Sequence, residues 1–505
     1  MSQKQNGNGH GNGNGGGITG LLAQPHKKAA TTMTEALDAE DNSVMFQTSE
    51  GVTLRGTPVR VQRQVVVFEL YNPRAIPLMS ELLGDFKIVL QRRQVYSGHA
   101  AVSKVVDAGT KIICESRLDA LDWVDLNLLP SLERDGGLSN QYETFLKERS
   151  GFYKVHPEFK VVVTDLQAYL HDLCHWLDKL ELNTKAFASP LQQQLELTAA
   201  QRLAKPVFET LEGLIERFES VAATLDDEED QSWAHRTFIR RQLHHLLLCA
   251  PFVNHTFTKP HGYAGDFEVV NMIVRNQFEG DSLYSRLINY WFLQQPPAQA
   301  HRNRIKYLTE NLRALAARTG GQGRPARVIS VGCGPAHEVQ NFLRDCHRAD
   351  LMEFTFLDFE ARALAYTESC LNAIQHQCNR DSQFKFVKKS VSQILREPIG
   401  KQCPQYDLVY CAGLFDYLAD PVCRQLTRVL YDWVAPGGML ITTNVDVSNP
   451  RKITMDYLLE WHLIYRNRND FMAIKPDNIP EDSCKVVADD TGVNIHFEAQ
   501  KSKHG

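Results

Sequence analysis

The stretch Val328-Ile-Ser-Val-Gly-Cys-Gly-Pro-Ala-His-Glu338 decides the fold of the C-terminal part of this 505-residue chain. Its apolar, β-branched start predicts a buried strand that leads into the turn Gly332-x-Gly334 and then into a helix. Glycines at such a turn let the backbone approach a ligand closely, and the helix N-terminus offers free N–H groups. A dinucleotide fingerprint would continue to a third glycine, but His337 stands there, which disfavours an NAD site.

Outward from this stretch, residues 324–503 alternate between strand and helix patterns. We expect a parallel sheet, because such alternation is typical of βαβ units. The turn Ala435-Pro-Gly-Gly438 precedes the fifth expected strand, and Asp490-Thr-Gly492 separates two final strands as in a hairpin. The expected strands are 326–331, 353–358, 384–387, 406–410, 438–443, 484–489 and 493–499, with helices at 338–346 and 361–377.

The middle of the chain, residues 139–320, is predicted to be helical. Phe208, Leu211, Leu214, Ile215, Phe218 and Val221 recur at helix spacing and form one apolar stripe. The acidic run Asp226–Asp230 is typical of a solvated loop between helices. Pro296-Pro297 should end one helix before the next begins. The further helices are expected at 233–248, 267–275, 282–293 and 305–317.

The N-terminal part divides into a tail and a β-rich segment. Residues 1–45 contain the run NGNGHGNGNGGG and are predicted to be disordered, since so many glycines are costly to order. Residues 46–130 hold short β-branched runs, which predict a small antiparallel barrel or sandwich. The runs lie at 51–55, 63–70, 86–90, 99–106 and 110–114, with turn signals at Asn72-Pro73, Gly84-Asp85, Ser97-Gly98 and Ala108-Gly109.

Composition excludes several classes of protein. A net charge of -5 and a pI of about 6.4 leave no domain-wide basic field, so we expect no nucleic-acid partner. No apolar run reaches the roughly 18 residues of a transmembrane helix, and the start lacks the apolar core of a secretory signal. The 11 cysteines are scattered singly without a Cys-x-x-Cys pair, which favours free thiols and a cytoplasmic location.

No metal site is predicted. His171, Cys174 and His175 share one helix face, but the glutamate of a His-Glu-x-x-His motif is absent. Such residues are more often part of a core or a domain boundary. His244-His245 and the pair His255 and His261 are interpreted in the same way.

Residues 324–503 resemble class I S-adenosylmethionine-dependent methyltransferases, through Gly332-x-Gly334, Asp358, the strand 406–410 and the final hairpin. The resemblance implies that Gly332, Gly334 and Glu338 lie beside the methionine part of the cofactor. Asp358 would hold the ribose and Phe359 would cover the adenine, although core packing is an equal alternative for Phe359 and Phe415. The other implied cofactor residues are Lys389, Ser390, Val391, Cys411, Ala412 and Gly413, and Leu414, Phe415, Asp416 and Tyr417 would face the substrate.

A second resemblance extends from about Trp233 to the C-terminus. Thr258-Lys-Pro-His-Gly-Tyr-Ala-Gly-Asp-Phe-Glu-Val-Val-Asn-Met272 and His301-Arg-Asn-Arg304 are similar to the helical region of the bacterial family that makes 3-hydroxypalmitic acid methyl ester. This implies a cytoplasmic carboxyl O-methyltransferase that acts on a small-molecule acyl substrate, with the helical segment as a lid. A fatty-acid carboxylate is already ionised at neutral pH, so no strong general base is needed.

Several residues are candidates for holding the substrate. Tyr263, Asp266 and Asn271 belong to a glycine-framed turn and the following helix, and Tyr263 and Asp266 are the expected catalytic positioning groups. The equal alternative is a helix N-cap at Asp266 with a packed tyrosine. Arg302 and Arg304 could pair a carboxylate bidentately, or be surface ion-pair partners. Trp291, Phe292 and Leu293 could line an acyl groove or pack in a helix core.

The segment 46–130 resembles a PilZ-type barrel, a bacterial module that often binds cyclic di-GMP. Arg55, Arg60 and Arg63 lie near its start but not in the family's Arg-x-x-x-Arg spacing, and the Asp/Asn-x-Ser-x-x-Gly element is absent. We therefore expect a structural or docking barrel and no cyclic di-GMP binding. Two alternatives remain open: a methyltransferase for a phenol, polyketide or amine, and a cyclic dinucleotide-responsive scaffold with a non-catalytic methyltransferase domain. The acyl chain length and the oligomeric state are not set by the sequence.

Overall fold

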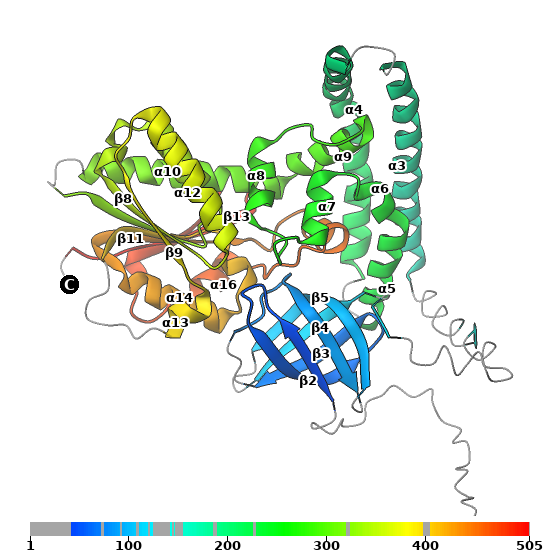
Figure 1. Ribbon diagram of the computed structural model, residues 1–505, viewed down its shortest axis with the longest axis horizontal. Helices are drawn as coiled ribbons and strands as arrows, with labels where there is room; N and C mark the ends of the chain where they lie inside the picture. Colours follow the sequence, from blue (N-terminus) through cyan, green and yellow to red (C-terminus); the bar gives the residue numbers. More distant parts are fainter. Residues whose placement is uncertain are drawn as a thin grey trace, which may run out of the picture. The chain divides into compact units, whose positions relative to one another are not determined.

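The computed structural model describes residues 42–71, 75–90, 93–107, 111–119, 122–124, 142–143, 146, 155–184, 189–225, 229–319, 324–396 and 405–503. Residues Leu37–Gly505 belong to one compact unit. That unit contains a closed β-barrel, a helical region and a C-terminal α/β sheet, which confirms the predicted fold class (Figure 1). Of the helices in the described ranges, none is long and apolar enough to cross a membrane.

The C-terminal sheet has seven strands in the order β12-β13-β11-β10-β7-β8-β9. Strands β9, β8, β7, β10 and β11 are parallel, whereas β13 runs antiparallel to both of its neighbours. The sheet therefore has the parallel core and terminal antiparallel hairpin that the sequence predicts. Its strands are β7 (Ala326–Val331), β8 (Met352–Asp358), β9 (Gln383–Lys388), β10 (Tyr406–Cys411), β11 (Val434–Val445), β12 (Cys484–Ala488) and β13 (Asn494–Gln500).

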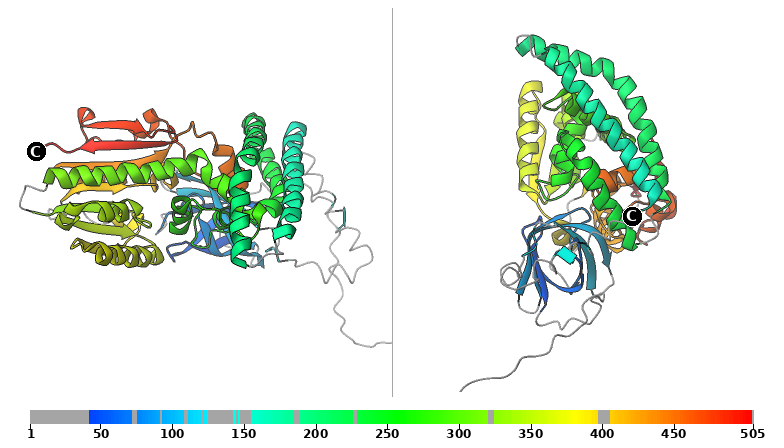
Figure 2. Two further views of the ribbon diagram at one scale, coloured as in Figure 1. Left: turned by 90° about the horizontal axis from the view of Figure 1, so that it is seen from above. Right: turned by 90° about the vertical axis from the view of Figure 1, so that its right-hand side faces the viewer.

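Helices cover both faces of this sheet (Figures 1 and 2). One core contains apolar side chains of α10 (Pro296–Thr319), α11 (His337–Asp345) and α12 (Ala361–Cys378). The core on the opposite face contains side chains of α13 (Val391–Arg396), α14 (Asp420–Asp432) and α16 (Arg468–Ala473). Because both faces are buried, the central strands are almost continuously apolar. Short 3-10 turns lie at η3 (His347–Leu351), η4 (Phe415–Tyr417) and η6 (Glu481–Ser483).

The helical region has its own apolar core, which also takes in the segment 453–463 that follows β11. Helices α3 and α4 lie side by side (Figure 2). Ser282 caps α9 by accepting from the backbone N–H of Ser285, and α10 starts at the Pro296-Pro297 break. The remaining elements are α3 (Pro157–Thr184), α4 (Ser189–Ala223), α5 (Glu229–Ile239), the π-helix η2 (Arg240–His244), α6 (His245–Leu247), α7 (Pro251–Thr258), α8 (Phe267–Arg275), α9 (Leu283–Gln294), α15 (Lys452–Thr454) and the π-helix η5 (Met455–Leu459).

The barrel is closed by six antiparallel strands in the order β1-β2-β3-β6-β5-β4. Alternate side chains of each strand point inward, and the rings of Phe46, Phe68, Phe86 and Tyr96 contact one another in the interior. The strands are β1 (Ser43–Gln47), β2 (Thr53–Val61), β3 (Val65–Tyr71), β4 (Leu82–Leu90), β5 (Arg93–Asp107) and β6 (Lys111–Leu118).

Three turn signals lie inside strands. Gly84-Asp85 is a bulge in β4, where the register with β5 shifts and Asp85 has a φ of 46°. Gly98 lies within β5, where a Cβ would collide with the side chain of Asp122. The run Ala435-Pro-Gly-Gly438 is an irregularity within β11. Strand β1 also starts before residue 46, whereas Asn72-Pro73 and Ala108-Gly109 lie outside the described residues.

Candidate functional site

A cavity opens at the carboxyl ends of β7, β8 and β10, where parallel sheets of this kind bind their ligands. Its lining comes from the C-terminal sheet, the helical region and the barrel. Of the residues predicted for the site, the cavity brings together Tyr263, Arg304, Gly332, Gly334, Glu338, Asp358, Phe359, Lys389, Ser390, Val391, Ala412, Gly413, Leu414, Asp416 and Tyr417. It does not include Asp266, Asn271, Arg302, Cys411 or Phe415. Of the three predicted acyl-groove residues it includes Phe292, whereas Trp291 and Leu293 are buried in the core of the helical region.

The glycine turn after β7 is fixed by its backbone. Gly332 and Gly334 have φ of 65° and 49°, in the left-handed region that favours glycine. The N–H groups of Gly332 and Cys333 both donate to the carbonyl of Leu357, and Thr367 Oγ1 donates to the carbonyl of Gly334. A Cβ on Gly334 would have no atom within 4 Å, so the turn borders open space. The turn therefore leaves room for a ligand against its backbone.

Asp358 ends β8 with its carboxylate buried beside this turn. It accepts from the N–H of Gly334 (3.0 Å) and from the N–H of Glu360 (3.0 Å). Burial raises the pKa of Asp358, while the backbone donors oppose the shift. The N–H of Phe359 and the thiol of Cys333 also interact with this carboxylate. Its position at the end of β8, beside the open turn, suits the two hydroxyls of a ribose. Next to it, the rings of Phe359 and Tyr263 are 5.5 Å apart and line the same cavity.

The turn after β10 has a guanidinium directly against it. Gly413 has a φ of 89° and donates its N–H to Thr443 Oγ1 (2.9 Å). A Cβ there would lie 2.8 Å from Nη1 of Arg304, so glycine lets the arginine approach the backbone. Arg304 is buried and donates to His301 Nε2 (2.6 Å), and no carboxylate among the described residues lies within 4 Å of it. Burial and Arg304 itself lower the pKa of His301 well below its ordinary value, so the imidazole is neutral.

Two carboxylates line the cavity around this guanidinium. Glu338 accepts from the hydroxyl of Tyr410 (2.8 Å), and burial raises its pKa. Asp416 accepts from the N–H of Val445 (2.6 Å), and burial raises its pKa to about 6. Both groups interact electrostatically with Arg304 but form no ion pair with it within the described part of the chain. Within the residues that the structure describes, the cavity therefore contains a buried cation without a paired anion.

The apolar part of the lining, which we call the apolar wall, comes from several separate regions. The barrel contributes 76–79, and the segment after β11 contributes Trp461 and Leu463. Trp461 Nε1 donates to the hydroxyl of Tyr417 (2.8 Å), and Gly265 lets both approach, because its Cβ would lie 2.4 Å from that hydroxyl. The wall includes Ile76, Pro77, Leu78, Met79, Val105, Ile112, Phe252, Ile273, Phe292, Pro297, Ala298, Met455, Leu459, Trp461 and Leu463, and further apolar side chains come from α8, α10 and the sheet.

The predicted residues outside the lining have structural contacts. Asp266 caps α8 by accepting from the N–H groups of Glu268 and Val269, which is the alternative that the sequence left open. Arg302 donates to the carbonyls of Ile273 and Leu293 and so joins the ends of α8 and α9. Asn271 contacts Glu268 and His337, Phe415 packs against Phe471, and Cys411 is buried in the sheet core.

Sequence reasoning missed His301, His337, Tyr410, Trp461 and residues 76–79 as lining residues. His301 had a signal, since it lies three residues before Arg304 on one helix face. The barrel segment had none, because its role depends on contacts between distant parts of the chain.

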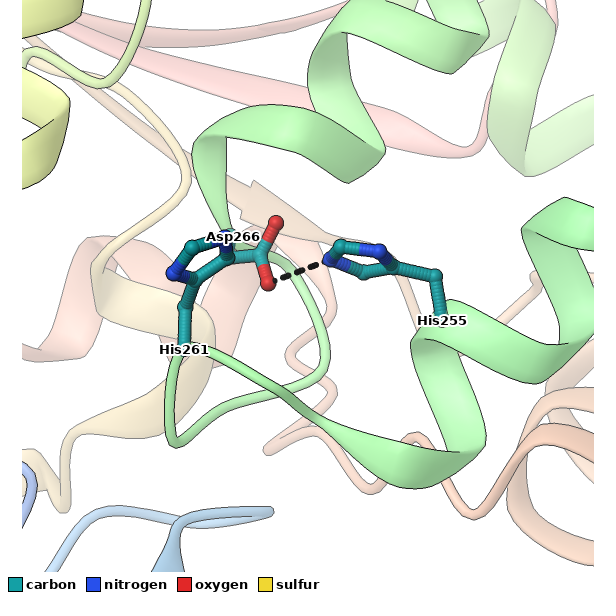
Figure 3. A group of neighbouring side chains, drawn as sticks. All are labelled: His255, His261 and Asp266. Carbon is teal, nitrogen blue, oxygen red and sulfur yellow. Dashed lines mark hydrogen bonds and ion pairs between the residues drawn. The ribbon is translucent and has the colours of Figure 1, made fainter.

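Figure 3 shows His255, His261 and Asp266, whose possible ligand atoms all lie within 4.8 Å of one another. One oxygen of Asp266 bonds His255 Nε2 (2.8 Å) and the other caps α8. His261 Nδ1 lies 3.2 Å from Glu360 Oε1, so both imidazoles face a carboxylate. These two pairs explain why the three side chains lie together, since they stabilise the turn that carries Tyr263. The separate trio His171, Cys174 and His175 is partly or fully exposed, with the two imidazoles 3.2 Å apart.

Residues 329–440 match the family model described as "Methyltransferase domain". A search of curated proteins finds no match. Similar solved structures include a possible exported protein from Bordetella parapertussis (18% identity, 50% of this chain and 86% of that chain, TM-score 0.38). Another is magnesium protoporphyrin IX methyltransferase from Synechocystis PCC 6803 (10% identity, 50% of this chain and 100% of that chain, TM-score 0.32). A third is the N-methyltransferase NodS from Bradyrhizobium japonicum WM9 (15% identity, 40% of this chain and 97% of that chain, TM-score 0.27).

Because these TM-scores are all below 0.5, the assignment depends on the family match and on the strand order of the sheet. Together they confirm a class I methyltransferase domain. The open turn at Gly334 and the carboxylate of Asp358 beside it fit S-adenosylmethionine as its cofactor.

Proposed function

We propose that the protein transfers a methyl group from S-adenosylmethionine to the carboxylate of a fatty acid or 3-hydroxy fatty acid, forming a methyl ester. The observation that carries this proposal is Arg304, a buried guanidinium in the cavity with no carboxylate of the described residues within 4 Å. A buried charge without a partner is costly, so this site favours an anionic ligand. Guanidinium geometry matches a carboxylate bidentately.

The apolar wall supports a long acyl chain as the rest of the acceptor. Its side chains are aliphatic and aromatic, and they are joined to the cofactor residues in one continuous cavity. Burial of an acyl chain contributes about 0.8 kcal/mol per methylene, so even part of such a chain would supply most of the binding free energy. A small polar acceptor would leave this surface without a ligand.

When bound, S-adenosylmethionine supplies an electrophilic methyl group on its sulfonium. Arg304 would hold the acceptor carboxylate, and neutral His301 fixes the guanidinium by accepting one of its N–H groups. Positioning an oxygen about 3–3.5 Å from the methyl carbon and excluding water are the main catalytic contributions. No proton has to be removed from a carboxylate at neutral pH. Tyr263 lines the cavity, and Asp266 holds the turn on which Tyr263 lies.

The first experiment incubates the protein with labelled S-adenosylmethionine and a series of saturated and 3-hydroxy fatty acids. We expect label in a product that mild base hydrolyses, as a methyl ester requires. Label only in a base-stable product would contradict carboxyl transfer and indicate an ether or amine product.

The second experiment tests Arg304 with Arg304→Gln. We expect the KM for the acyl acceptor to rise about 10- to 100-fold, from the loss of a charge-assisted bidentate contact, while the affinity for S-adenosylmethionine stays within about threefold. Arg313→Gln is the matched control, because Arg313 lies on the same helix, is exposed and lies outside the cavity. The KM of this variant should not change. If Arg304→Gln weakens only cofactor binding, the acceptor-carboxylate role is wrong.

The finer assignments belong to the same proposal: membership in the 3-hydroxypalmitic acid methyl ester family, a helical lid, a PilZ-like barrel and a cytoplasmic location. The closed six-stranded barrel supports the PilZ-like assignment, and the scattered cysteines support the cytoplasmic location. The ten cysteines described by the structure are all free thiols.

A further inference from the structure

A second cavity lies where the barrel meets α5 and the π-helix η2. It is lined by five basic side chains and, among the residues that the structure describes, by the single carboxylate of Glu115. The basic residues come from five different elements: β2, β5 and β6 of the barrel, the helix α5 and the π-helix η2. They are Arg60, Lys104, Arg117, Arg236 and Arg240.

Three carboxylates lie in or beside this cavity among the described residues: Glu115, Glu460 and Asp456, the last 3.3 Å from Nδ1 of the lining residue His462. Arg117 Nη2 (2.6 Å) and Arg240 Nε both donate to the same oxygen of Glu460, so one carboxylate serves two guanidinium groups. Glu115 accepts from the hydroxyl of Ser103 (3.0 Å). His462 carries no charge at neutral pH, because burial lowers its pKa to about 4. Among the described residues, five basic side chains therefore face three carboxylates at this cavity.

Two donors in the lining also lack acceptors. Nε of Arg60 and Nη1 of Arg117 are buried, and neither has a hydrogen-bond partner among the described residues. Arg117 is desolvated and close to Arg240 and Arg236, which lowers its pKa to about 9. Buried donors of charged groups are normally satisfied, so these two point to a ligand that accepts hydrogen bonds.

We propose that this cavity binds a phosphate-class anion, either free phosphate or the phosphoryl group of a larger ligand. A phosphoryl group carries up to two negative charges, and its oxygens point in several directions. The guanidinium groups likewise reach the cavity from different elements, on the barrel and on the helices. A planar carboxylate would match only one of them at a time. The site is separate from the methyltransferase cavity, since the two share no lining residue.

The test titrates inorganic phosphate, pyrophosphate and cyclic di-GMP into the full-length protein by calorimetry, in a phosphate-free buffer at low salt. We expect saturable binding of at least one probe, with one site per chain. Binding of inorganic phosphate or pyrophosphate would identify a free anion as the ligand, and binding of cyclic di-GMP alone would identify the phosphate of a nucleotide. No saturable heat with any of the three probes would overturn the proposal.

Arg60→Gln is the deciding variant, because Arg60 lines the cavity without holding Glu460. We expect it to weaken anion binding about tenfold, as expected for one charge-assisted hydrogen bond. Arg55→Gln is the matched control: it makes the same charge change on the same strand, but its side chain is exposed and outside the cavity. Equal weakening by both variants would show only non-specific surface charge and overturn the site. Lys104→Gln on β5 provides a second cavity variant if Arg60→Gln unfolds at a lower temperature.

Discussion

The two parts of the methyltransferase cavity are built in different ways. The cofactor side consists of turns at the ends of β7, β8 and β10, and backbone hydrogen bonds to Leu357, Asp358 and Thr443 fix these turns. The apolar wall consists mainly of side chains from the barrel, the helical region and the segment after β11. Its aliphatic and aromatic side chains offer a ligand apolar contact, and the indole N–H of Trp461 already donates to Tyr417.

This difference has a consequence for substitution. The cofactor side depends on a few groups in fixed positions, so single changes there should cause large losses of affinity. The apolar wall distributes its contribution over many contacts, each of about 0.1–0.2 kcal/mol, so single changes should alter the preference for chain length. The following predictions test this contrast.

The largest effect is expected for Asp358→Ala. It removes the acceptor for the ribose hydroxyls and also the carboxylate that holds the N–H groups of Gly334 and Glu360. Affinity for S-adenosylmethionine should fall about 100-fold, as expected for two charge-assisted hydrogen bonds. Calorimetry measures this directly, with Glu353→Ala at the opposite end of the same strand as the control. Equal affinity in Asp358→Ala and the native protein would remove Asp358 from the cofactor site.

A smaller and selective effect is expected for Leu78→Trp in the apolar wall. The larger ring would fill part of the cavity, so kcat/KM should fall about tenfold for long-chain acids and change little for acids of medium length. Cofactor affinity should stay unchanged. Steady-state kinetics over a series of chain lengths checks this, with Val59→Trp on the exposed face of the barrel as the control. A uniform loss at every chain length would show that this wall does not contact the acyl chain.

The smallest effect concerns Asp416, whose pKa burial raises to about 6. As the pH rises through this value, the carboxyl ionises and partly neutralises the field of Arg304, so binding of an acceptor carboxylate weakens. Relative to Asp416→Asn, the native KM for the acyl acceptor should rise about two- to threefold from about pH 5 to about pH 7. Parallel pH profiles of the two proteins would show that Asp416 does not affect the acceptor.

Much of the sheet could be predicted because its signals are local. Apolar strands, the turn Gly332-x-Gly334 and Asp358 lie close together in sequence, and the βαβ pattern predicts that the strands are parallel. The order of the strands in the sheet was not predicted. In the barrel, the sequence predicts turns at Gly84 and Gly98, but both glycines lie within strands. A glycine at a bulge or at a crowded strand position cannot be distinguished in sequence from a glycine in a turn.

Within the site, the sequence named residues but could not decide which of them share a cavity. Arg302 and Arg304 are equivalent in sequence, yet one joins helix ends and the other faces the cavity. The contribution of residues 76–79 depends on packing between regions that are far apart in the chain. Such contacts carry no local pattern, so only the structure reveals them.

The most direct measurement is a crystal structure of the protein with S-adenosylhomocysteine. We predict density with the ribose hydroxyls on Asp358, the adenine beside Phe359 and the amino-acid end near Gly332 and Gly334. Density for the nucleoside elsewhere, or a cavity that stays without it at saturating concentration, would contradict the cofactor site and with it the methyl transfer to a fatty acid.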